Sequence, residues 1–224
     1  MLIDLHNHTA PLSWDSLLTP DDLASKAKEV GLDGICLTEH DQFWEYDEAL
    51  TLSRRHGILV LPGVELTTED GHLLVFGLQR YVFGMHRTSF VKTEMEKAGG
   101  AIVAAHPYRR CFHEGDGPWV PPYSEQVEKA SRSPLLEVAV GVETLNGRGS
   151  ATQNRFSGDV CRSRDMKAAG ASDAHDVKDV ARFATDFARP ISDLRDLITE
   201  LKAGRFEPVD LRGGTAESID RRQL

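Results

Sequence analysis

Two histidines near the start of the chain, His6 and His8, are spaced so that both can hold one cation. They follow a short apolar run, and residues two apart on an extended strand face the same side. Imidazole nitrogens are common ligands of zinc and other transition metals. Two histidines at this spacing can equally well pair with backbone groups, so the pair alone is weak evidence for a metal site.

Seven further histidines and carboxylates stand in short polar motifs elsewhere in the chain. His40 lies in T-E-H-D, Glu65 in G-V-E and His106 in A-A-H-P-Y-R. Imidazoles and carboxylates without a thiolate suit zinc, manganese or iron, and magnesium is also compatible. The other members of this set are Asp15, His72 in G-H-L-L-V-F-G, and Asp173 with His175 in S-D-A-H.

The elements that must position these residues follow a βα pattern. Short apolar runs rich in β-branched residues alternate with segments of helical character, which favours βα units over an antiparallel sandwich. The clearest helix begins at Thr19, has Pro20 at its first helical position and stops at Gly31. We expect strands at 2–5, 34–37, 58–61, 73–76, 101–104, 136–140 and 168–171, a last helix at 192–203, and a long surface loop at 109–122.

Most of the polar motifs stand where an expected strand ends or shortly after it. In a barrel of parallel strands, the C-terminal strand ends converge on one mouth, where such folds carry their chemistry. The sequence therefore directs its imidazoles and carboxylates to one point.

We expect a single domain, 1–224, located in the cytoplasm. The three cysteines show no C-x-x-C spacing, so we expect reduced thiols rather than disulfides or a thiolate site. We find no signal peptide and no apolar stretch long enough to span a bilayer, and expect no membrane partner. The net charge of −9 argues against broad binding of nucleic acid through a basic face, but it allows a small phosphorylated substrate or a short nucleic acid as substrate. The sequence indicates no oligomeric state.

The ordered motifs D-L-H-N-H-T, T-E-H-D, G-V-E, A-H-P and S-D-A-H resemble those of the PHP (polymerase and histidinol phosphatase) superfamily. The resemblance covers residues 1 to about 190 and is closest to the small stand-alone phosphoesterases of that superfamily. It implies an α/β fold built as a distorted seven-stranded (β/α) barrel, TIM-like in outline. It also implies a centre of two or three divalent metal ions and hydrolysis of phosphate esters.

The resemblance also implies how the ligands are shared. His6, His8, Glu65 and Asp173 would hold one metal. Glu65 would bridge to a second metal completed by His72 and His106, and Asp15, His40 and His175 would take a third. Some relatives have histidine where Asp15 stands, so the third site is the one that departs from the common pattern.

Other residues are candidates for contact with the substrate. Arg109 and Arg110 follow His106, and a guanidinium there could hold a phosphate through two hydrogen bonds. Asn146 and Arg148 follow the sixth expected strand, and Asp41 could donate a proton or begin the next helix. A last group of aromatic residues could form a wall for a nucleobase or sugar, or pack into the core: Trp14, Phe43, Trp44 and Tyr46.

Three alternative functions remain open from the sequence. A histidinol-phosphatase-like activity is one, although the chain is short for it. A non-catalytic metal-binding module is another, but it would show lost ligands, and only Asp15 departs from the commonest residue type. A metal-dependent amidohydrolase also places H-x-H on its first strand, but it usually bridges its metals with a lysine where Glu65 would serve here.

Overall fold

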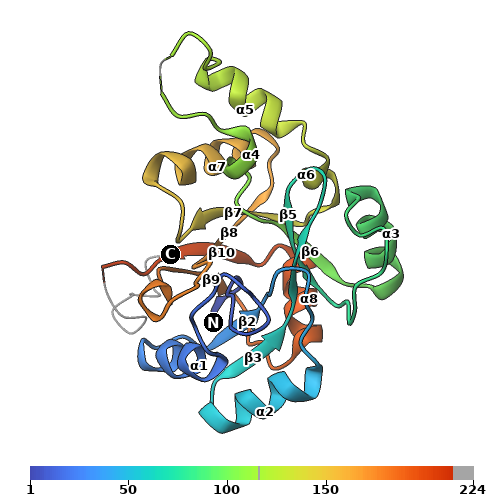
Figure 1. The fold of residues 1–224 in the computed structure, drawn as a ribbon, viewed down its shortest axis with the longest axis vertical. Helices are drawn as coiled ribbons and strands as arrows, with labels where there is room; N and C mark the ends of the chain where they lie inside the picture. The colour runs from blue at the N-terminus through green and yellow to red at the C-terminus, as the bar shows by residue number, and fades with distance from the viewer. Residues whose placement is uncertain (116, 214–224) are drawn as a thin grey trace.

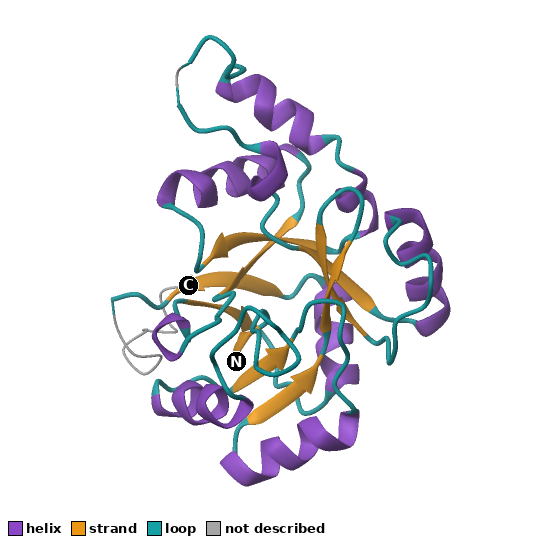
Figure 2. Cartoon of the chain, viewed as in Figure 1, coloured by secondary structure: helices purple, strands orange, loops and turns teal. Residues whose placement is uncertain are grey.

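The computed structural model describes residues 1–115 and 117–213, and strands and helices alternate along most of this length (Figures 1 and 2). The strands are β1 (Leu2–Asp4), β2 (Gly34–Leu37), β3 (Leu59–Pro62), β4 (Val64–Thr67), β5 (His72–Phe76), β6 (Ala101–Ala104), β7 (Gly141–Asn146), β8 (Lys167–Ala171), β9 (Phe183–Phe187) and β10 (Phe206–Asp210). The helices are α1 (Pro20–Glu29), α2 (Tyr46–His56), α3 (Thr88–Ala98), α4 (Tyr108–Cys111), α5 (Tyr123–Ser131), α6 (Pro134–Val138), α7 (Ala151–Ser163), the 3₁₀ turn η1 (Val177–Asp179) and α8 (Leu194–Ala203).

The strands form two five-stranded sheets. The first has the order β10-β9-β1-β2-β3, with β1 to β3 parallel and β9 antiparallel to both neighbours. The second has the order β4-β5-β6-β7-β8, with β6 to β8 parallel and β5 antiparallel to both neighbours. The expected α/β class is confirmed. The expected distorted seven-stranded (β/α) barrel is not confirmed, because the strands of the described residues form two separate hydrogen-bonded sheets.

The chain passes from the first sheet to the second at Gly63, between β3 and β4. A Cβ at this position would lie 2.7 Å from the ring of Phe76, so the close approach requires glycine. Two isolated parallel bridges still join the sheets, Asn7 with Ala174 and His40 with Glu65. Asn7, His40 and Ala174 lie beyond the carboxyl ends of parallel strands, and Glu65 is the second residue of β4. The bridges therefore keep the two sheets together at the end where the polar motifs are.

Apolar side chains form three clusters, one between the two sheets and two on their outer faces. One cluster fills the space between them and includes Ile3 and Cys36 from the first sheet and Leu74 and Val103 from the second. A second cluster packs α1 and α2 on the first sheet, and a third packs α3, α5, α6 and α7 on the second. The interior is therefore a packed core with helices outside, as in a barrel, even though the ladder is open.

Helix α1 begins where the sequence predicts. The Thr19 hydroxyl accepts the Asp22 N–H at 3.1 Å, Pro20 occupies the first turn, and Leu23 and Ala27 are buried on one face. The expected loop at 109–122 includes the end of the short helix α4.

The expected strand at 136–140 is wrong. Residues Pro134–Val138 form α6 instead, and the strand follows at Gly141. Ser133 caps this helix through Leu135 N, and Pro134 fixes its first φ angle. A short apolar run does not distinguish a buried strand from a buried helix, and the Ser-Pro start decides the outcome.

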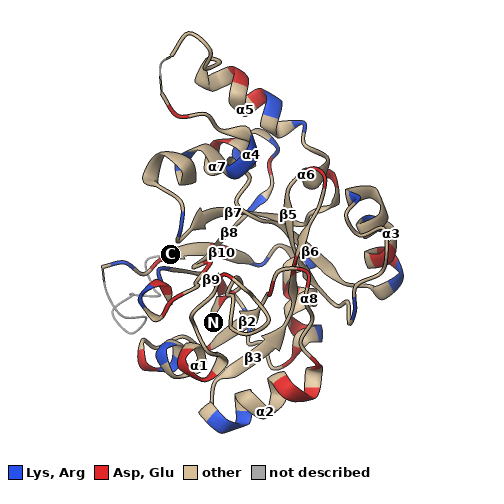
Figure 3. Ribbon diagram, viewed as in Figure 1, with Lys and Arg blue, Asp and Glu red and all other residues tan. Residues whose placement is uncertain are grey.

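Charged side chains of both signs alternate on the outer helices α1, α2 and α5 (Figure 3). These helices therefore present mixed surfaces rather than a basic face. Among the described residues, no helix is both long and apolar enough to cross a membrane.

Candidate metal centre

Glu65 lies at the centre of the polar cluster and is fully buried. Its Oε1 lies 2.8 Å from His72 Nδ1 and 2.8 Å from His106 Nε2. Its Oε2 lies 2.8 Å from His40 Nδ1 and 3.3 Å from His8 Nε2. One carboxylate thus has imidazoles against both oxygens, which is the arrangement that a bridging ligand requires.

The strand directions explain why residues from distant segments meet here. His6 and His8 follow the carboxyl end of β1, and His106 follows that of β6. His72 is the first residue of β5, and because β5 runs antiparallel to its neighbours, its first residue lies at the end where the parallel strands finish. Glu65 lies on β4 directly opposite His40 in the isolated bridge.

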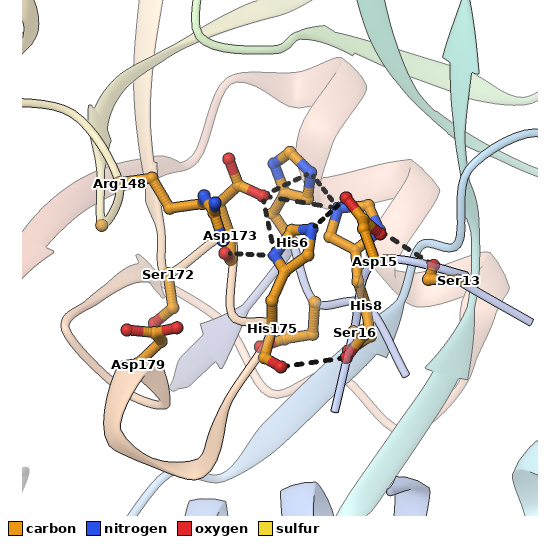
Figure 4. A network of polar contacts seen from close by, with 12 residues as sticks. His6, His8, Ser13, Asp15, Ser16, Arg148, Ser172, Asp173, His175 and Asp179 are labelled. Carbon is orange, nitrogen blue, oxygen red and sulfur yellow. Dashed lines mark hydrogen bonds and ion pairs between the residues drawn. The ribbon is translucent and has the colours of Figure 1, made fainter. Parts of the chain in front are cut away.

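His6, His8 and Asp173 form the deepest part of the cluster, and none is exposed to solvent. His6 Nε2 and His8 Nε2 lie 2.9 Å apart, and Asp173 Oδ1 lies 3.6 Å and 3.4 Å from them. Figure 4 shows Asp173 and these imidazoles pointing toward one another from different segments.

Asp15, His40 and His175 form the outer part of the cluster. Asp15 Oδ2 lies 3.3 Å from His40 Nε2 and 3.2 Å from His175 Nε2. The His175 Nδ1–H donates to the Asp173 carbonyl at 2.9 Å, which leaves Nε2 with its lone pair toward Asp15. The structure therefore brings all nine predicted ligands to one end of the sheets.

The donor atoms fit a group of cations. Four overlapping triplets have ligand atoms within 4.8 Å of one another. Two carboxylate atoms of the cluster, Glu65 Oε2 and Asp173 Oδ1, are buried and accept no well-directed hydrogen bond from the imidazoles around them, which costs free energy unless a positive charge lies nearby. The four triplets are His8, His40 and His175; His6, His106 and Asp173; His6, His8 and Glu65; and Glu65, His72 and His106.

The protonation of the metal-free cluster reflects this crowding. Burial alone would raise the pKa of the Glu65 carboxyl, but the charge of His6 and a hydrogen bond from His106 hold it well below its usual range. Burial lowers the pKa of His8 to about 4. The pKa of His6 is raised, because Asp173 and neighbouring glutamates outweigh its burial. The carboxylates thus stay ionised and His8 stays neutral, which are the forms that bind metals, whereas a cation bound by His6 would displace its proton.

Glu143, which the sequence analysis did not single out, supports the cluster from behind. Its Oε1 accepts the His6 Nδ1–H at 3.0 Å, and its Oε2 accepts the backbone N–H of His106 at 2.8 Å. The first contact directs His6 Nε2 toward the cluster. A signal was present in the sequence, because Glu143 stands in a second G-V-E inside an apolar strand, where an acid is rarely buried without a partner.

Glu39 has a similar role for His8 and was also missed. The Ser13 hydroxyl donates to Glu39 Oε2 and accepts the His8 Nδ1–H at 3.2 Å. The other carboxylate oxygen accepts the Trp44 Nε1–H at 2.9 Å. Trp44 is therefore a structural residue that helps to orient His8.

Three residues of the site have positive φ angles, Asp41 at 53°, His106 at 25° and Asp173 at 51°. This region is unfavourable for residues with a Cβ, and such strain concentrates at functional sites. For His106 the backbone contact with Glu143 Oε2 holds the conformation.

The predicted substrate residues differ in where they lie. An open cleft of about 840 Å³ is lined by Asp41, Arg109 and Arg148 together with Asp15, His40, His72 and His175. Asn146 lies behind this cleft, where its Nδ2 donates to Asp173 Oδ2 at 3.1 Å. Arg110 donates to the carbonyls of Thr68 and Glu69 at 3.0 and 3.2 Å. The structure thus gives Asn146 and Arg110 partners within the protein.

The two arginines of the cleft also differ. Arg109 donates to Asp173 Oδ2, and this charge raises the pKa of its guanidinium against the effect of burial. Arg148 extends toward Asp173 in Figure 4, and its backbone N–H donates to Asn146 Oδ1 at 3.0 Å. Asp41 Oδ1 accepts the Thr67 N–H at 2.9 Å, which fixes this carboxyl at the cleft rim.

The four aromatic residues that could form a wall or pack into the core also differ in where they lie. Phe43 packs with the hydrophobic cluster on the second sheet and Trp44 with that on the first. Tyr46 begins α2 and is exposed. Trp14 alone of the four lines the cleft.

Comparison with known proteins agrees with this architecture. The PHP domain family model matches residues 4–135, and the PHP-associated model matches 151–206. The chain is 31% identical over 102 residues to DNA polymerase III PolC-type of Oceanobacillus iheyensis, covering 45% of this chain and 7% of that protein. It is 30% identical over 110 residues to 5′-3′ exoribonuclease Rnm of Salmonella typhimurium, covering 46% of this chain and 37% of that protein.

A solved structure shares the fold. It is a two-domain protein of Bacteroides vulgatus containing a predicted PHP-like metal-dependent phosphoesterase. The match has a TM-score of 0.66 and 20% identity, and it covers 94% of this chain and 64% of that chain. The chain therefore spans less than two thirds of each of these three proteins.

Proposed function

The chain belongs to the PHP domain family, and from this membership and the site geometry we propose that it is a metal-dependent phosphoesterase. The proposed cofactors are two or three divalent cations, zinc, manganese or iron, with magnesium as a further possibility. The proposed ligands are the nine side chains of the cluster. The observation that carries the proposal is the position of Glu65, whose two oxygens each face imidazoles in a buried site.

Cations bound in such a cluster would lower the pKa of a coordinated water and withdraw charge from the phosphoryl oxygens. Glu65 would bridge two of them, and Glu143 and Glu39 would hold His6 and His8 in the required tautomers. Imidazoles bind without adding charge, so Glu65 and Asp173 supply the negative charge that offsets the cations.

The cleft supplies the groups for substrate binding. Arg148 has no hydrogen bond or ion pair from its guanidinium to another described residue, so it is the cation we assign to a phosphoryl oxygen. Arg109 would share this role while orienting Asp173. Asp41 has one oxygen held by Thr67, and we propose that the other takes or gives a proton at the leaving group.

The proposed substrates are small phosphate esters, nucleotides or the end of a short nucleic acid. The relatives include a polymerase and an exoribonuclease, which supports phosphate ester chemistry as a class. The open cleft admits a substrate much larger than a phosphoryl group.

Two measurements test the proposal together. Elemental analysis of purified protein should find at least two transition-metal ions per chain. A screen with added manganese and zinc should find hydrolysis of phosphomonoesters, nucleotides or short diesters, and no hydrolysis of amide substrates. Absence of metal from a folded preparation, or hydrolysis of amides alone, would overturn it.

A further inference from the structure

Trp14 exposes its indole at the rim of the cleft, beside a proposed ligand. It is 87% exposed and lines the same cleft as His40, His72 and His175. The next residue is Asp15, which contacts two of these imidazoles. Because this large apolar ring beside the proposed ligands is almost fully exposed, burial in the core does not explain its position.

The backbone around Trp14 is fixed on both sides. Trp14 and Asp15 are the central residues of a turn closed by a hydrogen bond of 3.2 Å from Ser16 N to the Ser13 carbonyl. The Ser13 hydroxyl donates to Glu39, and the Ser16 hydroxyl donates to the His8 carbonyl at 2.7 Å. The indole is thus carried by a short turn tied to the cluster, so a ligand that stacks on it does not have to order the backbone at this position.

The rest of the cleft suits an organic group next to a phosphate. Tyr108 and Phe112 also line it, and Phe112 is held by a stacked contact with Phe156 at 4.8 Å between ring centroids. The volume of about 840 Å³ lies in the range of sites for whole small molecules. An apolar ring and several proposed metal ligands in the lining of one cleft match a ligand with a planar ring at one end and a phosphate at the other.

We propose that Trp14 is a specificity-determining residue on which a nucleobase of the substrate stacks while the attached phosphate reaches the metal cluster. This inference rests on the proposed phosphoesterase function and narrows it to esters of nucleosides. Stacking of a base on an aromatic side chain depends on the face of the ring, so Trp14 selects for the presence of a base without selecting one base over another.

The test compares two substrates that share the same phosphate and sugar. Adenosine 5′-monophosphate carries a base, and ribose 5-phosphate does not. The Trp14→Ala variant should lose about tenfold in kcat/KM for the nucleotide, within the range for one stacked base, and stay within about twofold for ribose 5-phosphate. Trp14→Phe should keep most of the activity on the nucleotide, because phenylalanine restores a ring.

The chain offers a matched control in Trp119. It is 93% exposed and lines a different pocket, with Lys129 and Arg132. Trp119→Ala should leave kcat/KM for both substrates within about twofold of the parent. Equal losses for both substrates in Trp14→Ala would place the contact on the sugar or the fold and overturn the inference, as would no loss for either.

A binding measurement gives a second readout. Adenosine 5′-monophosphate should quench the tryptophan fluorescence of the parent and of Trp119→Phe, but much less that of Trp14→Phe, whereas ribose 5-phosphate should quench none of them. Equal quenching of all three proteins by the nucleotide would overturn the inference. If the parent hydrolyses both esters equally, the inference fails and the phosphoesterase function stands. If the metal-loaded protein hydrolyses no phosphate ester, the proposed function fails, and the quenching still decides whether a base stacks on Trp14.

Discussion

Glu65 and His40 face each other across the bridge that joins the two sheets, with Glu65 Oε2 2.8 Å from His40 Nδ1. The backbone contact is reciprocal, because the Glu65 N–H donates to the Glu39 carbonyl at 3.1 Å and the Asp41 N–H donates to the Glu65 carbonyl at 3.0 Å. The cluster and the junction of the sheets are therefore the same place. A substitution in the cluster should therefore also change the stability of the junction between the sheets.

Glu65→Gln should remove the charge that holds two cations together. We expect fewer bound metal ions per chain and a loss of turnover of more than about 100-fold, beyond the 10–100-fold typical of residues that only orient ligands. Elemental analysis and kcat on the best substrate measure both effects. Glu69→Gln, at an exposed position four residues on, is the control; normal metal content and rate in Glu65→Gln would place the bridge elsewhere.

Glu143→Gln should weaken metal binding although Glu143 is not a proposed ligand. An amide can offer its N–H₂ to His6 Nδ1 and so favour the wrong tautomer. The expected loss of metal affinity is about 10–100-fold, measured by competition with a chelating dye. Glu137→Gln is the control: Glu137 lies on α6 and forms an exposed ion pair with Arg164, and its loss should leave the metal affinity unchanged. An unaltered affinity in Glu143→Gln would show that His6 is oriented by other contacts.

In the metal-free protein, His8 should contribute a loss of stability as the pH falls from about 6.5 to 4. The pKa of His8 is lowered from 6.5 to about 4, so between these pH values His8 binds a proton in the unfolded chain but not in the folded chain. Protonation of His8 therefore favours unfolding as the pH falls. The size is on the order of 3 kcal/mol. Denaturant unfolding of chelator-treated protein measures it.

His8→Asn should remove this loss of stability, whereas His86→Asn, at an exposed position, should preserve it. The lowered pKa values of Glu65 and Asp173 place their loss of stability below about pH 4. Burial raises the pKa of the Asp4 carboxyl to about 7, so Asp4 adds stability as the pH falls through the same window, and the contribution of His8 is the difference between the parent and His8→Asn. The same pH dependence of stability between pH 6.5 and 4 in the parent and in His8→Asn would contradict the assignment of His8 as a buried neutral imidazole.

The sequence predicted the cluster better than the strands that carry it. The nine proposed ligands followed from motifs that resemble those of the PHP superfamily, because the spacing of His6 and His8 by itself is weak evidence for a metal site. The reversal of β5 could not be found from periodicity, since a strand of either direction shows the same pattern. The position of Asn146 behind Asp173 could not be predicted from the sequence either. A shift of one residue in strand register turns a side chain to the other face of the sheet.

Arg148 and Arg109 should behave differently when truncated, because only Arg109 is paired with a proposed ligand. Arg148→Ala removes a guanidinium with no partner among the described residues, so metal content should stay at the parent level. Its kcat/KM should fall roughly 30-fold. This loss corresponds to about 2 kcal/mol of transition-state stabilisation, the scale of a charge-assisted hydrogen bond to a phosphoryl group.

Arg109→Ala instead leaves Asp173 Oδ2 with Asn146 alone as its hydrogen-bond donor. Both metal affinity and kcat/KM should then fall, because Asp173 loses the contact that orients it. Arg110→Ala is the matched control, since its guanidinium donates to the carbonyls of Thr68 and Glu69. If Arg148→Ala stays within about threefold of the parent, a difference of roughly 0.6 kcal/mol, while Arg109→Ala loses activity at full metal content, then Arg109 is the phosphate-binding residue and Arg148 only borders the cleft.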